Sequence, residues 1–164
     1  MGAICYIEAH MTDSQIPIVI LIKAWQDAKL DAYSIRKRVF IEEQRVPEEM
    51  ELDEFDLNAQ HALAYADSEC IGTARLVNLT GSVGSIGSIG RIGRMAVLPS
   101  YRGQGIGKQL LGALLKACQS QGIKQIELHA QATVIPFYEQ FGFITQGDIY
   151  DEAGIPHRDM ILRI

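Results

Sequence analysis

The 164-residue sequence has few cysteines and no long apolar run, and each shortage excludes a class of protein. The three cysteines, Cys5, Cys70 and Cys118, are far apart and odd in number, so a disulfide framework is not expected. Reduced thiols favour a cytoplasmic location instead. The four histidines are equally scattered, so the sequence predicts no metal site. Because no apolar run reaches the roughly 18 residues of a membrane-spanning helix, no membrane partner is expected.

Basic residues are outnumbered as well. The chain has 15 Lys and Arg against 20 Asp and Glu, which gives a net charge of −5. A nucleic-acid partner is therefore not expected, because phosphate contacts need clustered positive charge. The length suits one domain with a sizeable core. We expect this domain over residues 16–164, after a peripheral N-terminal extension, residues 1–15, in which Met11 is a plausible native start.

The stretch around which the chain is organised is residues 91–115. An apolar run, Ile92–Leu98, predicts a buried strand that Pro99 ends. The glycine-rich segment Arg102–Gly107 then leads into a predicted helix, whose apolar face is Ile106, Leu110, Leu111, Leu114, Leu115 and Cys118. A glycine loop before a helix N-terminus can bind an anion, because the first helical N–H groups have no partner and no Cβ blocks the approach.

Two common phosphate-binding motifs do not fit this loop. A Walker A loop needs Ser or Thr where Gln109 stands and Gly where Arg102 stands. The dinucleotide fingerprint needs Gly at Lys108. The remaining pattern, Arg102-x-x-Gly105-x-Gly107 after a strand, resembles motif A of the GNAT superfamily of acyl-CoA-dependent N-acyltransferases. There, the loop amides hold the pyrophosphate of acetyl-CoA.

A second string, Pro136–Phe143, resembles motif B of the same superfamily. The resemblance implies that the Tyr138 hydroxyl protonates the departing CoA thiolate, although a buried tyrosine is more commonly a core residue. It also implies that the amides of residues 95–97 line the pantetheine and that one of them polarises the thioester carbonyl. The implied acetyl-CoA site comprises Met95, Ala96, Val97, Arg102, Gly103, Gln104, Gly105, Ile106, Gly107, Lys108, Phe137 and Tyr138.

Further strings narrow the resemblance to the ElaA-like group of the superfamily, from about Ile18 to the C-terminus. They are Arg36-x-x-Val-Phe-x-x-Glu-Gln-x-x-Pro47, Glu51-x-Asp53-x-x-Asp56, His61, Gly72–Arg75, Ala130-Gln131 and Gly154–His157. The resemblance implies an α/β class with the GNAT fold. In that fold a central mixed, mostly antiparallel sheet is splayed and flanked by helices in three layers.

The residue patterns alone also predict alternating strands and helices of an α/β protein. Glycines at every third position from Gly81 to Gly93 predict a flexible loop without chemistry. The expected strands are 18–22, 61–67, 71–79, 92–98, 124–130, 143–150 and 157–164, and the expected helices lie in 25–40, 106–118 and 133–140.

An acidic segment follows the first predicted helix. It could be a solvated surface or a negative rim that attracts a cationic amine, and the sequence leaves both open. Its eight carboxylates are Glu42, Glu43, Glu48, Glu49, Glu51, Asp53, Glu54 and Asp56.

The general base is not fixed by the sequence. Residues 92–96 contain no carboxylate, so the candidates are His129, Glu43 and a water relay. His129 is the predicted catalytic partner of Tyr138. Glu43, Arg75 and Gln131 are predicted substrate-binding residues, although Arg75 in an apolar strand could instead be structural.

These inferences predict an N-acetyltransferase. It would move the acetyl group of acetyl-CoA to a primary amine of a small molecule by direct attack in a ternary complex, with no metal. Homodimers are common in the superfamily. Two alternatives remain: a non-catalytic acyl-CoA sensor, and a nucleotide-binding protein, which Gln109 disfavours.

Overall fold

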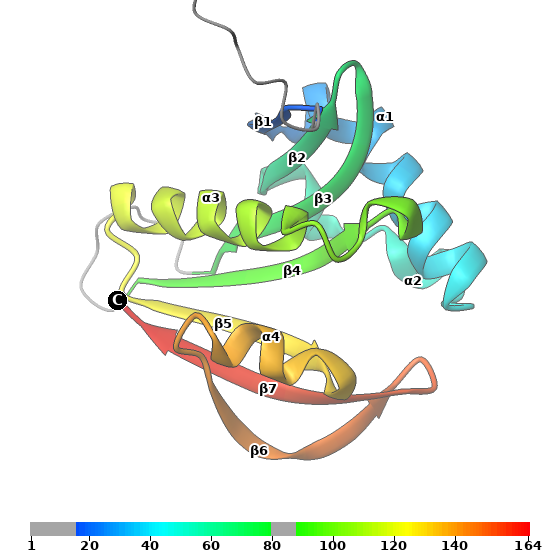
Figure 1. The fold of residues 1–164 in the computed structure, drawn as a ribbon. Coiled ribbons are helices and arrows are strands. Elements are labelled where there is room, and N and C mark those ends of the chain that lie inside the picture. Colours follow the sequence, from blue (N-terminus) through cyan, green and yellow to red (C-terminus); the bar gives the residue numbers. More distant parts are fainter. Residues whose placement is uncertain (1–15, 80–87) are drawn as a thin grey trace, which may run out of the picture.

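The computed structural model describes residues 16–79 and 88–164, which form a seven-stranded sheet flanked by helices (Figure 1). The proposed extension, residues 1–15, and most of the predicted glycine loop lie outside the described residues. The strand order is β1-β2-β3-β4-β5-β7-β6. The strands are β1 (Ile18–Ala24), β2 (Gln60–Ala66), β3 (Glu69–Asn78), β4 (Ile89–Val97), β5 (Gln125–Gln131), β6 (Ile144–Glu152) and β7 (Ile155–Arg163).

Within the described ranges, four α-helices and several shorter helical segments connect the strands. The α-helices are α1 (Trp25–Arg36), α2 (Glu48–Glu51), α3 (Ile106–Ser120) and α4 (Ile135–Glu139). The other helical segments are the π-helix η1 (Lys37–Glu43) and the 3-10 turns η2 (Glu54–Asn58), η3 (Pro99–Tyr101) and η4 (Ala132–Val134).

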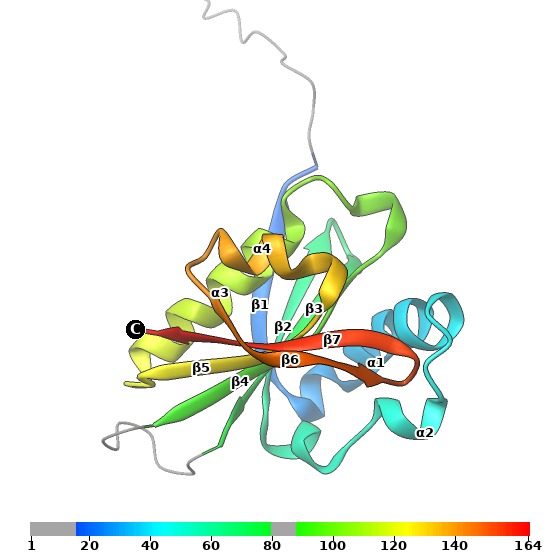
Figure 2. The same ribbon diagram turned by 90° about the horizontal axis from the view of Figure 1, so that it is seen from below.

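The helices cover both faces of the sheet, which gives three layers. Successive side chains of a strand point to opposite faces. On β2, Leu63 packs with Trp25 of α1, whereas Ala62 and Ala64 belong to the larger core that contains Leu110 of α3. Figure 2 shows α1 and α2 on one side of the sheet and α3 and α4 on the other. The predicted three-layer α/β class with a mixed sheet is confirmed.

The sheet splits between β4 and β5. These strands run parallel and pair only over Ile89–Arg91 and Gln125–Glu127, whereas the other neighbouring strands described here are antiparallel. Beyond Arg91 the two strands diverge, as Figure 1 shows to the right of the C-terminus. The facing backbone edges of β4 after Arg91 and β5 after Glu127 therefore have no strand partner among the described residues. Backbone donors and acceptors inside a protein need partners, so this gap is suited to a ligand.

A β-bulge reshapes β4 where the gap opens. The register with β3 shifts between Thr73 and Arg75, and Arg94 has a φ of +51°, in the left-handed region. A bulge places an extra residue on one strand and redirects the side chains that follow it. Arg94 then contacts Glu51 on the α2 side of the sheet, while the next residue, Met95, packs in the core beneath α3.

Most predicted elements are present, with two corrections. The predicted helix 25–40 is an α-helix only to Arg36 and continues to Glu43 as a π-helix. The predicted loop through Gly93 is wrong at its end, because β4 begins at Ile89 and includes Gly90. A Cβ on Gly90 would lie 3.1 Å from Leu76 Cδ1 and 3.2 Å from Ile123 Cδ1, so this glycine permits close packing rather than a flexible turn.

Candidate active site

A cleft of about 830 Å³ occupies the gap between β4 and β5. Its walls come from η1, β4, the glycine loop, β5, α4 and the β6–β7 turn. The loop and the gap are thus parts of one continuous cleft, as a ligand with a phosphate end and a reactive end would need.

The glycine loop has the backbone of an anion cradle. Gly103 and Gly105 have φ values of +75° and +80°, which residues with a Cβ rarely adopt. Helix α3 begins at Ile106 with no side-chain cap, so the N–H groups of its first turn are available. Lys108 and Gly107 of that turn also line the cleft. Gln104, which was also predicted to bind the cofactor, does not line the cleft. Its side-chain amide donates to the Ser100 carbonyl instead (3.1 Å).

The predicted reactive end of the cofactor site is the second half of β4. Met95, Ala96 and Val97 all line the cleft. Two of these residues pair with β3, Ala96 with Thr73 and Val97 with Gly72, so one edge of the strand is satisfied by the sheet. The opposite edge faces the gap. The role of these backbone groups in binding pantetheine stays a prediction.

Tyr138 reaches the cleft from α4. The residue is 9% exposed, and its hydroxyl lies 3.8 Å from Met95 Sδ, a weak acceptor. Burial raises the pKa of Tyr138 to about 12, so the phenol is protonated at neutral pH. Phe137, its neighbour, also lines the cleft and stacks edge-on against the Tyr138 ring, with ring centroids 5.0 Å apart.

Arg102, predicted to bind the cofactor, is held by Glu43. Its two Nη atoms lie 2.8 and 2.7 Å from the two Glu43 carboxylate oxygens, and its Nε donates to the Val97 carbonyl (2.9 Å). The hydrogen bond from Arg102 lowers the pKa of Glu43. Glu43, predicted as a substrate contact, does not line the cleft; it ties η1 to the glycine loop instead.

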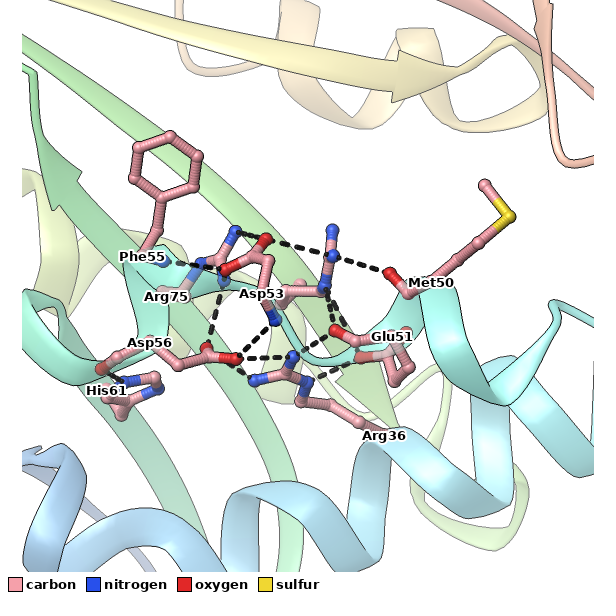
Figure 3. Close-up of polar contacts among 9 residues, drawn as sticks. Arg36, Met50, Glu51, Asp53, Phe55, Asp56, His61 and Arg75 are labelled. Atoms are coloured by element: carbon pink, nitrogen blue, oxygen red, sulfur yellow. Dashed lines mark hydrogen bonds and ion pairs between the residues drawn. The ribbon is translucent and has the colours of Figure 1, made fainter.

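Arg75 belongs to a network of buried and partly buried charges between β3, β4, α1 and the α2–η2 segment (Figure 3). Arg75 Nη1 lies 2.6 Å from Asp53 Oδ1 and 2.9 Å from Asp56 Oδ1. Its Nε is buried without a hydrogen-bond partner among the described residues, and Arg75 also lines the cleft. This charge network consists of Arg36, Arg75, Arg94, Glu51, Asp53 and Asp56.

Arg36 is the centre of that network and is fully buried. Its guanidinium contacts both Glu51 and Asp56. Burial alone would raise the pKa of Asp56, but hydrogen bonds and charges from Arg36 and Arg75 lower it to about 2. Both interpretations of the acidic segment are therefore incomplete, because four of its eight carboxylates, Glu43, Glu51, Asp53 and Asp56, form ion pairs with arginines.

The opposite wall of the cleft carries Gln131 and His129 of β5. Gln131 donates its side-chain amide to Gln44 Oε1 (2.8 Å), which joins β5 to the end of η1. His129 is 40% exposed in its side chain, and its Nε2 lies 3.9 Å from Asp159 Oδ1. Gln44 and His157 also line this part of the cleft. Both residues occur in the strings that resemble the ElaA-like group, but the sequence alone indicates no role for either.

The described residues contain no group of three or more metal-binding side chains. They also contain no helix that is long and apolar enough to cross a membrane.

The sequence is similar to those of proteins described as acetyltransferases. A family model described as an acetyltransferase (GNAT) domain matches residues 10–164. A Bacillus subtilis protein provisionally named an acetyltransferase is 40% identical over 131 residues, covering 77% of this chain and 83% of that protein. Protein ElaA of Escherichia coli is 31% identical over 147 residues, covering 83% of this chain and 94% of ElaA.

Solved structures show the same similarity. The crystal structure of Escherichia coli ElaA superposes with a TM-score of 0.78 and 28% identity, covering 88% of this chain and 99% of ElaA. An acyl-CoA N-acyltransferase from Pseudomonas aeruginosa superposes with a TM-score of 0.75 and 28% identity, with the same coverage. The strand gap, the glycine loop and these matches agree: this chain belongs to the GNAT acetyltransferase family.

Proposed function

We propose that the protein is an N-acetyltransferase that transfers the acetyl group of acetyl-CoA to a primary amine of a small molecule. The observation that carries the proposal is the continuity of the cleft. It runs from the glycine loop and the uncapped end of α3, past the unpaired edge of β4, to the Tyr138 hydroxyl. These are the parts that a pyrophosphate, a pantetheine arm and a thioester would need in that order.

The residues at each end fit acetyl-CoA. The glycine loop offers N–H groups and no Cβ: a Cβ at Gly103 or Gly105 would point into open space where the phosphates would lie. Lys108 adds positive charge to the same wall. At the other end, the free backbone edge of residues 95–97 supplies donors for the pantetheine amides and for the thioester oxygen, where negative charge develops during attack.

The reaction we propose is direct attack in a ternary complex. An unprotonated amine forms a C–N bond to the thioester carbon, and the C–S bond breaks as the tetrahedral intermediate collapses. Tyr138 donates its proton to the leaving sulfur, because a phenol that stays protonated at neutral pH can stabilise a thiolate. The amine needs a base, and the sequence-based candidate, His129, lies on the cleft wall formed by β5. Cys118 is fully buried in the core, which argues against a covalent acyl-enzyme.

Transfer can be tested without knowing the natural acceptor. The protein would be incubated with acetyl-CoA and probe amines of three kinds, spermidine, glucosamine 6-phosphate and a tripeptide, while free thiol release and acetylated product are measured. Acetylation of at least one amine supports the proposal. Tight acetyl-CoA binding without transfer to any of them would instead favour the acyl-CoA sensor. A small-molecule acceptor, a cytoplasmic location and a homodimer stay predictions.

A further inference from the structure

His157 is a second imidazole on the wall of the cleft, at the start of β7. Its Nδ1 lies 2.7 Å from the carbonyl oxygen of Ile155, two residues earlier. A carbonyl oxygen only accepts hydrogen bonds, so Nδ1 must carry the proton. In the neutral ring Nε2 is then the atom with the free lone pair. The β6–β7 turn that creates this contact includes Ala153 and Gly154, both with positive φ.

The free nitrogen of His157 has no hydrogen-bond partner among the described residues. The nearest charged group is the Glu152 carboxylate, whose Oε2 lies 3.9 Å from Nε2, beyond hydrogen-bond distance. His157 is 9% exposed and lines the cleft, as does Glu152. The Tyr150 ring of β6 stacks on the imidazole, with ring centroids 6.1 Å apart. The ring is therefore fixed by packing on one side and by the Ile155 carbonyl on the other.

His129, the alternative, is held less firmly. Its imidazole makes no hydrogen bond among the described residues, although it packs edge-on against the Tyr150 ring with centroids 6.3 Å apart. Its contact with Asp159 at 3.9 Å is with a half-exposed carboxylate whose Oδ1 already accepts from Tyr150 (2.6 Å). The imidazole is also the more exposed of the two, at 40% against 11% for the side chain of His157. A general base works best when its orientation and tautomer are set before the substrate arrives.

The sheet places His157 and Tyr138 on opposite faces. His157 is the cross-strand partner of Gln131, so both side chains share one face of the sheet. That face is the one covered by α1 and η1, because Gln131 bonds to Gln44 at the end of η1. Tyr138 lies in the core on the α3 side. A base and an acid on opposite sides of the gap can serve the entering amine and the leaving sulfur without exchanging a proton directly.

We infer that His157 is the general base of the transfer: its Nε2 takes the proton of the acceptor ammonium on the α1 side of the gap. This inference rests on the proposed function. The first ammonium proton moves to Nε2 and leaves for solvent past the Glu152 carboxylate, which also stabilises the imidazolium. The second leaves the nitrogen as the intermediate collapses and restores Tyr138, which has protonated the sulfur. An alkylammonium ion and the thioester thus give an amide, a thiol and one released proton.

Two matched variants separate His157 from His129. His157→Asn keeps an N–H group that can donate to the Ile155 carbonyl but has no basic atom in place of Nε2. His129→Asn makes the same change on the neighbouring strand. With a probe amine that the wild type acetylates, such as spermidine, kcat/KM should fall about 100-fold in His157→Asn and much less in His129→Asn. Acetyl-CoA affinity should be unchanged in both, and both variants should remain folded at the assay temperature.

The basicity of the acceptor supplies a readout that a structural role would not move. Hydroxylamine is largely unprotonated at neutral pH and needs no ammonium deprotonation, so the defect of His157→Asn should be clearly smaller with hydroxylamine than with spermidine. Equal defects with both acceptors, an activity within about threefold of wild type, or the larger loss in His129→Asn would each overturn the assignment.

Long-range ¹H–¹⁵N NMR of the histidine rings tests the premise directly. The neutral form of His157 should carry its proton on Nδ1; a dominant Nε2–H tautomer would overturn the assignment. The two proposals fail in different ways. A wild-type protein that acetylates none of the probe amines defeats the transferase proposal, whereas an active wild type with an unaffected His157→Asn variant defeats only the role of His157.

Discussion

The Tyr138 hydroxyl, at the end of the proposed acetyl-CoA site, points at the sulfur of Met95 on β4, 3.8 Å away. A thioether accepts a hydrogen bond weakly, so the phenol has no strong partner among the described residues with which a leaving thiolate would have to compete. Substrate and acid would meet where β4 and α4 face each other. The position of α4 against β4 therefore sets where the proposed acid lies in the cleft.

Removing that hydroxyl should affect turnover and spare cofactor binding. Tyr138→Phe keeps the ring that packs in the core, so we expect kcat to fall about 100-fold while the Kd of acetyl-CoA changes little. The measurement is thiol release under saturating acetyl-CoA, with calorimetry for the Kd. Tyr33→Phe is the matched control, since the Tyr33 hydroxyl contacts Glu48 on the exposed surface. A Tyr138→Phe variant as active as the control would show that the thiolate needs no acid here.

The ion pair between Glu43 and Arg102 should compete with the cofactor for the arginine. Glu43→Gln removes the charge that holds the guanidinium, so acetyl-CoA should bind at least as tightly as to wild type. Arg102→Gln should weaken binding about tenfold, because a charge-assisted contact to phosphate is lost. Calorimetric titration at low salt measures both, since this pair is about 40% exposed and salt would screen it.

A different outcome for Glu43→Gln would restore its predicted substrate role. If the variant raised the KM of the amine and left the Kd of acetyl-CoA unchanged, Glu43 would contact the acceptor. If both variants weakened acetyl-CoA binding equally, the pair would act as a clamp that shapes the glycine loop.

Arg36 should be the residue on which the stability of the acidic segment depends most. Arg36→Met keeps much of the side-chain volume but leaves Glu51 and Asp56 buried without their cation, so unfolding should cost about 3–5 kcal/mol less than in wild type. Urea unfolding followed by circular dichroism measures the change. Lys37→Met, at the next and exposed position, is the control and should stay within about 0.5 kcal/mol. Equal stability of the two variants would contradict the structural role of the network.

The same network predicts how acid destabilises the protein. The pKa of Asp56 is about 2 when folded, against 3.8 for the unperturbed group, which corresponds to about 2 kcal/mol. Because the folded pKa is the lower one, this contribution is present above pH 4 and is lost as the pH falls toward 2. Asp56→Asn should therefore lose stability at neutral pH and show a weaker dependence on pH below 4. Urea midpoints at pH 6 and pH 3 measure this.

Asp148→Asn is the control for the acid experiment. Asp148 is exposed on β6, so its variant should follow the wild-type pH dependence. If Asp56→Asn showed the full wild-type decrease between pH 6 and pH 3, the decrease would have to come from other groups.

The strand, loop and helix of the proposed cofactor site could be predicted from the sequence because they are contiguous in the chain. The apolar run Ile92–Leu98 indicates the strand, the glycines of residues 103–107 indicate the loop, and the apolar spacing of α3 indicates the helix. Because these segments are consecutive, the loop leads directly into the helix N-terminus. The start of β4 was predicted too late, at Ile92, whereas the strand begins at Ile89 and includes Gly90. There, glycine accommodates Leu76 and Ile123, which are distant in the sequence.

The acceptor half could not be predicted in the same way, because its contacts join distant segments. In the sequence, Asp56 looks like an exposed surface residue. Only the fold shows that Arg36 of α1 and Arg75 of β3 bind its carboxylate. Gln44 meets Gln131 across 87 positions of sequence. The string Gly154–His157 was noticeable, but only the folded turn shows that Ile155 fixes the tautomer of His157.

The central claim is that the glycine loop holds the phosphates of acetyl-CoA, and one calorimetric comparison tests it most directly. Gly105 has a φ of +80° and open space around its missing Cβ, so Asn and Asp are the substitutions that its backbone best tolerates. Gly105→Asn and Gly105→Asp impose the same backbone strain and differ by one negative charge. We predict that wild type binds acetyl-CoA, that the Asn variant binds more weakly, and that the Asp variant binds weakest by a wide margin at low salt. A wild-type protein that does not bind acetyl-CoA, or an Asp variant that binds as tightly as the Asn variant, would contradict the account.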